Sequence, residues 1–313
     1  MKIFWNKDYI SVNHSFDTTR KSLNIIDLLE LNKNLPSQLK ELKDVPKNIE
    51  VVDPDVSIDS SITDDLIDRF CDPLYVRALK TGDKMNLAES SGFPWDKNTY
   101  KFARAHTHGL IASIEEVIKN GGRSGSLSSG LHHGSPRWGC GFCTINGIAL
   151  SAIFAQLKGF HPIVLDFDAH CGGGTMEFLD EFVESQKSTD ITHIDLSTNS
   201  FDSYNTGDKP WAYLDICGNQ DNYLHRIELA LKEADKFRND KTIFIYNAGV
   251  DPVGAHGIDH RVIAEREKMV SDFIGKDKAV FALAGGYSGQ SYSRNEVARD
   301  HLLNIVEWAW KTK

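Results

Sequence analysis

The chain alternates between short apolar runs and longer amphipathic stretches from about residue 124 to its end. Continuous apolar runs are typical of strands buried on both faces of a parallel sheet, whereas apolar residues spaced three or four apart indicate helices. The predicted strands are one that ends within 125–133 and those at 162–170, 191–197, 242–251 and 279–288. The predicted helices are 144–160, 174–185, 221–237, 258–274 and a last helix that ends near Trp310.

The first 120 residues are less regular. A short apolar run at 2–5 suggests a strand, and the apolar spacing predicts helices around 23–34, 61–80 and 98–120. The rest of the segment up to residue 60 is polar and is expected to be irregular surface. Strands that alternate with helices predict an α/β fold, with three α/β/α layers around a mostly parallel sheet. No repeat or low-complexity linker interrupts the chain, so 1–313 is expected to form a single domain.

Composition narrows the class of protein. The chain is 41% hydrophobic and 25% charged, as globular proteins are. Its net charge of -9 disfavours nucleic-acid binding, which usually needs a basic face. No apolar stretch reaches the roughly 20 residues that span a membrane, and the start has no signal-peptide core. Five scattered cysteines do not suggest a disulfide framework, so we expect reduced, buried thiols and a cytoplasmic protein; the sequence does not predict an oligomeric state.

Polar residues gather where the apolar strands end. Asp166 and Asp168 close one strand, Asp251 closes another, and Gly285-Gly286-Tyr287 follows the last. In α/β sheets, ligand sites lie outside the carboxyl ends of the strands. These separate segments are therefore expected to meet at one site.

The run D-F-D-A-H at 166–170 predicts a metal site. Strand alternation places Asp166, Asp168 and His170 on the same side, where buried charges are costly unless they are neutralised. Carboxylate and imidazole ligands suit zinc or iron(II), and Asp251 is the best further ligand. The alternative is that these aspartates cap the helices that follow, but four such residues together favour a metal.

Two adjacent histidines, His132 and His133, follow the strand that ends within 125–133. A neutral histidine beside an activated water is a suitable general base, because its pKa lies near neutral pH. Taken alone, a pair of adjacent histidines is as compatible with two surface residues as with a catalytic pair. Its meaning depends on the motifs around it.

Four motifs occur in order between about 124 and 290: SSGLHHGSPRWGCGFCTINGIALSA, PIVLDFDAHCGGGTMEF, NAGVDP and LAGGYS. Together they resemble the signature of the histone deacetylase and acetylpolyamine amidohydrolase family, within the arginase–deacetylase superfamily. The first 120 residues match loosely, although HSFDTTRKS at 14–22 sits where the family has an arginine-bearing segment. The resemblance implies the arginase–deacetylase type of α/β fold and a zinc-dependent amidohydrolase that acts on an N-acyl amine, such as an acyl-lysine peptide or an acetylpolyamine.

The resemblance also assigns roles to residues. It implies that zinc, or alternatively iron(II), is held by Asp168, His170 and Asp251, and that Asp166 orients His132 and helps to hold a monovalent cation such as K⁺. One of the tandem histidines, His132 and His133, would polarise the water and the other would act as general acid, while Tyr287 would donate a hydrogen bond to the substrate carbonyl. The substrate tunnel would be lined by Gly141, Phe142, Gly285 and Gly286.

Two positions depart from the family pattern. Where the family has a second histidine and then a polar residue, this chain has Cys171 and Gly173. We therefore predict that His133 lacks a carboxylate partner and is less basic. A catalytically weak acyl-lysine reader is the alternative that this departure raises. The residue that would bind the substrate backbone at the rim of the site is undecided between Pro94 and Asp96.

A ureohydrolase of the arginase type is a further alternative, with two manganese ions. Its metals need the motif D-A-H-x-D, and Gly172 stands where the last aspartate would be, which favours one metal. Two other histidine pairs, His106 with His108 and His256 with His260, are interpreted as structural. Gly257 disfavours a zinc-binding helix at the second pair.

Overall fold

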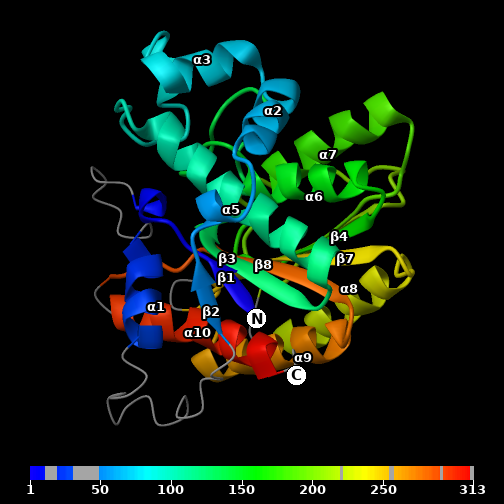
Figure 1. Cartoon of the computed structure of the whole chain (residues 1–313). Coiled ribbons are helices and arrows are strands. Elements are labelled where there is room, and N and C mark those ends of the chain that lie inside the picture. The colour runs from blue at the N-terminus through cyan, green and yellow to red at the C-terminus, as the bar shows by residue number, and fades with distance from the viewer. Residues whose placement is uncertain (11–19, 31–48, 219–220, 254–256, 290–291, 311–313) are drawn as a thin grey trace.

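The computed structural model describes residues 1–10, 20–30, 49–218, 221–253, 257–289 and 292–310 (Figure 1). Eight strands form one sheet in the order β2-β1-β3-β8-β7-β4-β5-β6, and the strand pairs in it are parallel. The predicted α/β fold with a parallel central sheet is confirmed. The strands are β1 (Lys2–Phe4), β2 (Glu50–Val52), β3 (Arg123–Ser129), β4 (His161–Asp166), β5 (Thr192–Ser197), β6 (Ala212–Ile216), β7 (Thr242–Gly249) and β8 (Lys278–Ala284).

Helices cover both faces of this sheet (Figure 1). The described helices are α1 (Lys21–Glu30), α2 (Ser61–Phe70), α3 (Pro73–Thr81), α4 (Met85–Ala88), α5 (Thr99–Asn120), α6 (Gly147–Leu157), α7 (Gly173–Gln186), α8 (Tyr223–Asp235), α9 (His260–Ile274) and α10 (Arg294–Trp310), with 3₁₀ turns η1 (Lys7–Tyr9) and η5 (Pro54–Val56). Alternation along β4 shows the two layers. Ile163 and Leu165 pack in the cluster that includes α8, α9 and α10, whereas Val164 packs with α5 and α6.

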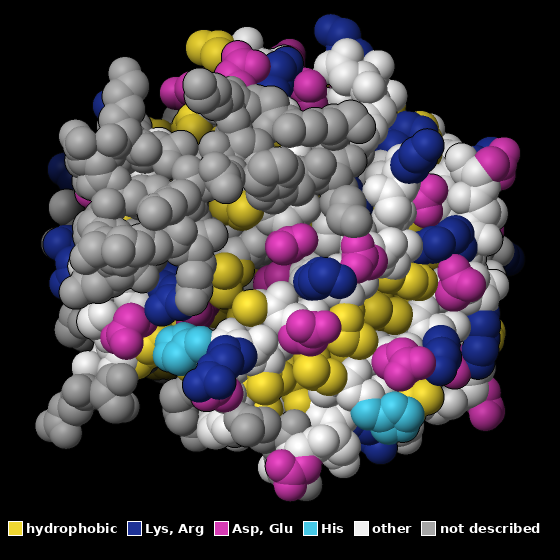
Figure 2. Space-filling model, turned by 90° about the horizontal axis from the view of Figure 1, so that it is seen from below, with side chains coloured by type: hydrophobic (Ala, Val, Ile, Leu, Met, Phe, Trp, Pro, Cys, Tyr) yellow, Lys and Arg dark blue, Asp and Glu magenta, His cyan; other side chains and the backbone are white. Residues whose placement is uncertain are grey.

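The outer surface of the layer formed by α8, α9 and α10 is solvated. Figure 2 shows this side of the molecule, where acidic and basic side chains are interspersed with apolar ones. A shallow groove between α8 and α9 includes Leu231, Met269 and Phe273. No described helix is long and apolar enough to cross a membrane. All five cysteines are free thiols, as expected from their spacing.

Several details differ from the predicted elements. The helix expected at 61–80 is two helices, because Pro73 begins α3 and Asp72 caps it by accepting hydrogen bonds from the amides of Leu74 and Tyr75. The strands β2 and β6 were not predicted. Both lie at the edges of the sheet, where a strand is short and lacks an apolar run.

Four neighbouring strands, β3, β8, β7 and β4, end at the same edge of the sheet. The pairing of β3 with β8 shifts register between Ser126 and Ser129, immediately before the tandem histidines. The four sequence motifs therefore converge because they follow adjacent parallel strands.

Candidate active site

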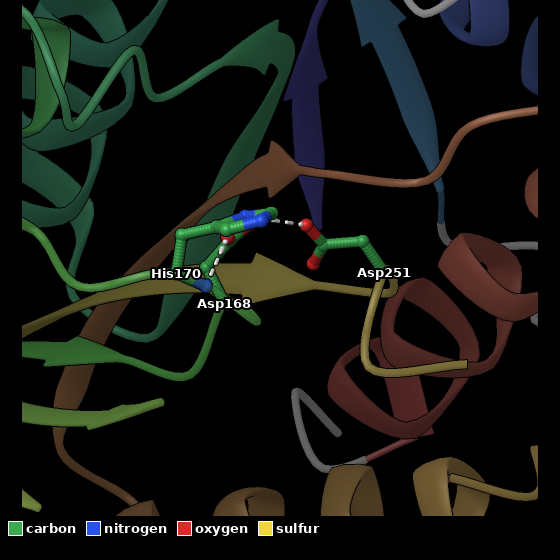
Figure 3. Close-up of side chains that lie close together, drawn as sticks. All are labelled: Asp168, His170 and Asp251. Atoms are coloured by element: carbon green, nitrogen blue, oxygen red, sulfur yellow. Dashed lines mark hydrogen bonds and ion pairs between the residues drawn. The ribbon is translucent and has the colours of Figure 1, made fainter. Parts of the chain in front are cut away.

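Asp168, His170 and Asp251 lie together at this edge of the sheet (Figure 3). Asp168 and His170 belong to the loop after β4, and Asp251 follows β7. One ligand-type atom from each residue lies within 4.8 Å of the others. His170 Nδ1 is 3.3 Å from Asp168 Oδ1 and 3.2 Å from Asp251 Oδ2, and both carboxylates are buried.

The donor set fits a divalent cation. Burial, and then repulsion by Asp168, raises the pKa of Asp251, so two ionised carboxylates here are costly without a neutralising charge. Two carboxylates and one imidazole are three ligands of the kind that zinc binds in catalytic sites, where a fourth position stays open. Gly285 makes room for this arrangement, because a Cβ there would overlap Cγ and Oδ1 of Asp251.

Arg266 ties the two ligand-bearing segments together. Its buried guanidinium donates to the carbonyl of Phe167 at 3.0 Å and to that of Gly249 at 2.6 Å. Glu267 pairs with the guanidinium, so that the buried charge is compensated. Arg266 thus links the chain just after β4 to the last residue of β7.

His132 is oriented by Asp166. Its Nδ1 lies 2.8 Å from Asp166 Oδ2, while its Nε2 is 3.6 Å from Asp168 Oδ1. Burial alone would lower the pKa of His132, but Asp166 and Asp168 raise it to about 10. A cation bound beside Asp168 would oppose that increase. Asn247 donates a hydrogen bond to the other oxygen of Asp166, which holds the carboxylate in place.

The prediction that His133 lacks a carboxylate partner is wrong. Its Nδ1 lies 2.8 Å from Oδ2 of Asp202, a residue in the connection between β5 and β6. The pKa of His133 is nevertheless lowered, by burial and then by the neighbouring His132. The carboxylate is present but comes from a segment that the sequence motifs do not include.

A pocket opens over the tandem histidines and Asp168. Its wall includes Gly141 and Phe142 on one side and Gly285 and Tyr287 on another. Gly286 instead lies against Val250 and Val297. Burial, followed by Asp251 and Asp168, raises the pKa of the Tyr287 hydroxyl, which keeps it protonated as a donor.

Two aromatic residues of this site were missed by sequence reasoning. Phe93 packs on Phe142 with ring centroids 5.1 Å apart, and it lines the cavity within the segment where the rim was undecided. Phe201 lines the adjoining opening with Phe142 and Tyr287. Phe201 follows a strand that carries no recognised motif, so only its place after β5 could have indicated it.

Lys21 was also missed. It is a buried residue at the start of α1, and its Nζ donates to the carbonyl of Gly285 at 2.6 Å. Burial lowers its pKa to about 8, against the attraction of Asp168 and Asp251. Residues 14–19 of the segment that resembles the family's arginine-bearing region lie outside the described residues, but this lysine belongs to the same segment and reaches the site.

Of the four histidines interpreted as structural, the three that the structure describes do not line the pocket. His106 accepts from the amide of Ser129 and lies 2.9 Å from the carbonyl of Tyr9, and His108 pairs with Thr63. His260 begins α9 with its Nδ1 2.7 Å from Asp300, while His256 lies outside the described residues.

Comparisons with known proteins identify the family of the chain. The sequence profile of the histone deacetylase domain matches residues 31–301. Acetoin utilization protein AcuC from Staphylococcus aureus (strain MRSA252) is 27% identical over 173 residues, which cover 52% of this chain and 40% of AcuC. The chain spans between 24% and 40% of the length of the first curated relatives that it matches.

Solved structures share the fold. The HDA15 HD domain superposes with a TM-score of 0.72 at 17% identity, covering 97% of this chain and 90% of that domain. Acetylpolyamine aminohydrolase from Burkholderia pseudomallei has a TM-score of 0.71 at 14% identity, with 98% of each chain covered. The fold and the site thus define an α/β protein of the arginase–deacetylase type with a candidate metal centre. The chain belongs to the histone deacetylase family.

Proposed function

We propose that this protein is a metal-dependent amidohydrolase that removes an acyl group from an amine. The observation that carries the proposal is the meeting of the buried triad with two carboxylate-paired histidines and a tyrosine around one cavity. Each group has a separate task in amide hydrolysis, which needs an activated water, a polarised carbonyl and a protonated leaving amine.

Asp168, His170 and Asp251 would hold a zinc-class ion, with iron(II) as the alternative. Such an ion, when bound, supplies a Lewis acid for the carbonyl and lowers the pKa of water. The one imidazole and two carboxylates suit either metal. The K⁺ suggested near the strand of Asp166 stays a prediction.

His133 would carry the proton. It lines both the cavity and the adjoining opening, and its lowered pKa leaves it neutral and able to accept a proton near neutral pH. It would take a proton as the water oxygen adds to the carbonyl carbon, and return it to the nitrogen as the C–N bond breaks. The products are a carboxylic acid and a free amine. His132, held by Asp166, would stabilise negative charge beside it.

Tyr287 would donate its hydroxyl proton to the oxygen of the substrate carbonyl. Donors aimed at the developing oxyanion are worth a few kcal/mol in such reactions. Phe142, Gly141 and Phe201 would flank an extended acyl-amine chain, since their side chains and backbone line the opening.

The substrate class proposed is an acylated primary amine, either an acyl-lysine peptide or an acetylpolyamine. The structural neighbour from Burkholderia pseudomallei is an acetylpolyamine aminohydrolase, which supports the second of these substrates. The net charge of -9 would favour a cationic amine. We further propose a single catalytic domain in a reducing compartment such as the cytoplasm, in keeping with the one sheet and the free thiols.

The alternative of a catalytically weak acyl-lysine reader loses its motivation, because that motivation was the absence of a partner for His133. A panel of acetyl-lysine peptides, acetylpolyamines and small amides, offered to zinc-loaded protein, tests the proposal. Release of acetate, abolished in Asp168→Ala, is the expected result. Binding of these compounds without hydrolysis by zinc- or iron(II)-loaded protein would support a reader instead.

A further inference from the structure

We infer that Asp202 is a positioning residue for His133. The family pattern has the polar partner of this histidine at the start of α7, at position 173, whereas here the carboxylate comes from the connection between β5 and β6. Asp202 occupies the space that a side chain at Gly173 would fill. The inference rests on the proposed function, and it concerns which residues set the orientation of the proton carrier. In this inference Asp202, Gly173 and Cys171 act together to orient His133.

The contact between Asp202 and His133 is direct. Asp202 Oδ2 lies 2.8 Å from His133 Nδ1, and the same oxygen accepts a weaker hydrogen bond from the amide of Gly174 at 3.3 Å. A carboxylate on Nδ1 fixes the tautomer whose proton is on Nδ1 and leaves Nε2 free to accept. The ring is therefore held with its accepting nitrogen away from Asp202.

Gly173 and Asp202 occupy the same space. A Cβ on Gly173 would overlap Oδ1 of Asp202 and lie 2.6 Å from its Cγ and 2.5 Å from its carbonyl oxygen. A side chain at position 173 and the observed position of Asp202 are therefore mutually exclusive. The carboxylate of Asp202 can take its observed position only because residue 173 is a glycine.

The segment that carries Asp202 is anchored to the loop of the metal ligands. The amides of Thr198 and Asn199 both donate to the carbonyl of Ala169, at 2.9 and 2.8 Å. Cys171 donates its amide to the carbonyl of Phe201 at 3.0 Å, and its thiol to the carbonyl of Asn199 at 3.4 Å. Both departures from the family motif, at 171 and at 173, thus face this one segment.

The same segment also places the ring of Phe201 against the site. Its ring stands edge-on to His133, with centroids 5.1 Å apart, and to His170, at 5.8 Å. The residue that lines the opening and the residue that orients His133 are neighbours in sequence. Asp202 also has a φ of 59°, a left-handed conformation that aspartate and asparagine tolerate better than most residues.

The decisive variant is Asp202→Asn, which keeps the shape and the left-handed conformation but removes the charge. Proton NMR of the metal-free protein supplies a readout that does not depend on activity. Downfield imidazole resonances are expected from Nδ1–H of His133 and from Nδ1–H of His132, which is bonded to Asp166. The variant should move or lose the first and keep the second, while Asp208→Asn, an exposed aspartate of the same connection, changes neither.

In the zinc-loaded enzyme, Asp202→Asn should lower kcat by about 10- to 100-fold with little change in KM, as outer partners of catalytic groups do. Gly173→Ala should reproduce both effects, because its Cβ displaces Asp202, whereas Gly218→Ala adds a Cβ in open space and serves as its control. Unchanged His133 resonance and unchanged kcat in both variants would overturn the inference. A wild-type protein that shows the resonance but hydrolyses nothing would instead count against the proposed function alone.

Discussion

The absence of a side chain at Gly285 leaves the space that the carboxylate of Asp251, a candidate metal ligand, occupies. Gly285 has a φ of 52°, and a Cβ on it would overlap the carboxylate of Asp251. The glycine after β8 is therefore required by a metal-ligand candidate after the neighbouring strand β7, and the two motifs NAGVDP and LAGGYS depend on each other in space.

Gly285→Ala is expected to weaken metal binding by about 10-fold or more, since displaced support around a ligand has effects of that size. Isothermal titration with zinc measures it. Gly275→Ala is the matched control, because Gly275 has a similar φ of 60° but its Cβ would meet only ordinary contacts near 3.8 Å. Wild-type zinc affinity in both alanine variants would show that Asp251 does not need the space at Gly285.

Tyr287→Phe removes the hydroxyl group that is the proposed donor to the oxyanion. We expect kcat to fall by about 10²- to 10³-fold, the usual effect of losing one such donor. KM and metal content should stay close to those of the wild type, because Tyr287 is not one of the three candidate ligands. Steady-state kinetics on the best substrate of the panel, with metal analysis of the same sample, provides the check. A phenylalanine variant with full kcat would remove Tyr287 from the mechanism.

Acid should destabilise the fold through His106. Burial lowers its pKa to about 4, below the ordinary value near 6.5, although the hydrogen bonds of its two ring nitrogens with the backbone of Tyr9 and Ser129 oppose that decrease. Above pH 6.5 it is neutral in both the folded and the unfolded chain. As the pH falls from about 6.5 towards 4, the unfolded chain takes up a proton that the folded one does not, and stability is lost, by at most about 3 kcal/mol.

Urea unfolding at pH 7 and pH 5 measures that loss. His106→Gln should show a smaller difference between the two pH values than the wild type, since glutamine does not titrate. His225→Gln, at a side chain exposed over 65% of its area, should keep the wild-type difference. An equal pH effect in all three proteins would show that His106 is not responsible.

The sequence predicted the centre of the sheet better than its edges. β4, β7 and β8 are buried on both faces and appear as continuous apolar runs. Two of the three residues of β2 are exposed and β6 is half-buried, so neither has a periodic apolar signal. An edge strand has one neighbour and one covered face at most, and local sequence carries little information about it.

Within the site, too, some residues could be predicted from the sequence and others could not. Asp168 and Asp251 directly follow apolar strands, and their place at the carboxyl edge could be predicted from the chain alone. Asp202 lies beyond the end of β5, and its meeting with His133 depends on the path of an irregular segment. Lys21 precedes the site by more than 100 residues and reaches it only through the packing of α1. Contacts of this kind need the three-dimensional structure.

The proposed activity depends above all on the triad of Asp168, His170 and Asp251. The most direct test is the metal content of the purified chain after loading with zinc and removal of excess, measured by mass spectrometry of the elements. We predict one ion per chain in the wild type, as a three-ligand site with one open position requires, and loss of that ion in Asp168→Ala, His170→Ala and Asp251→Ala. Two ions per chain, or one ion that persists in all three variants, would contradict it.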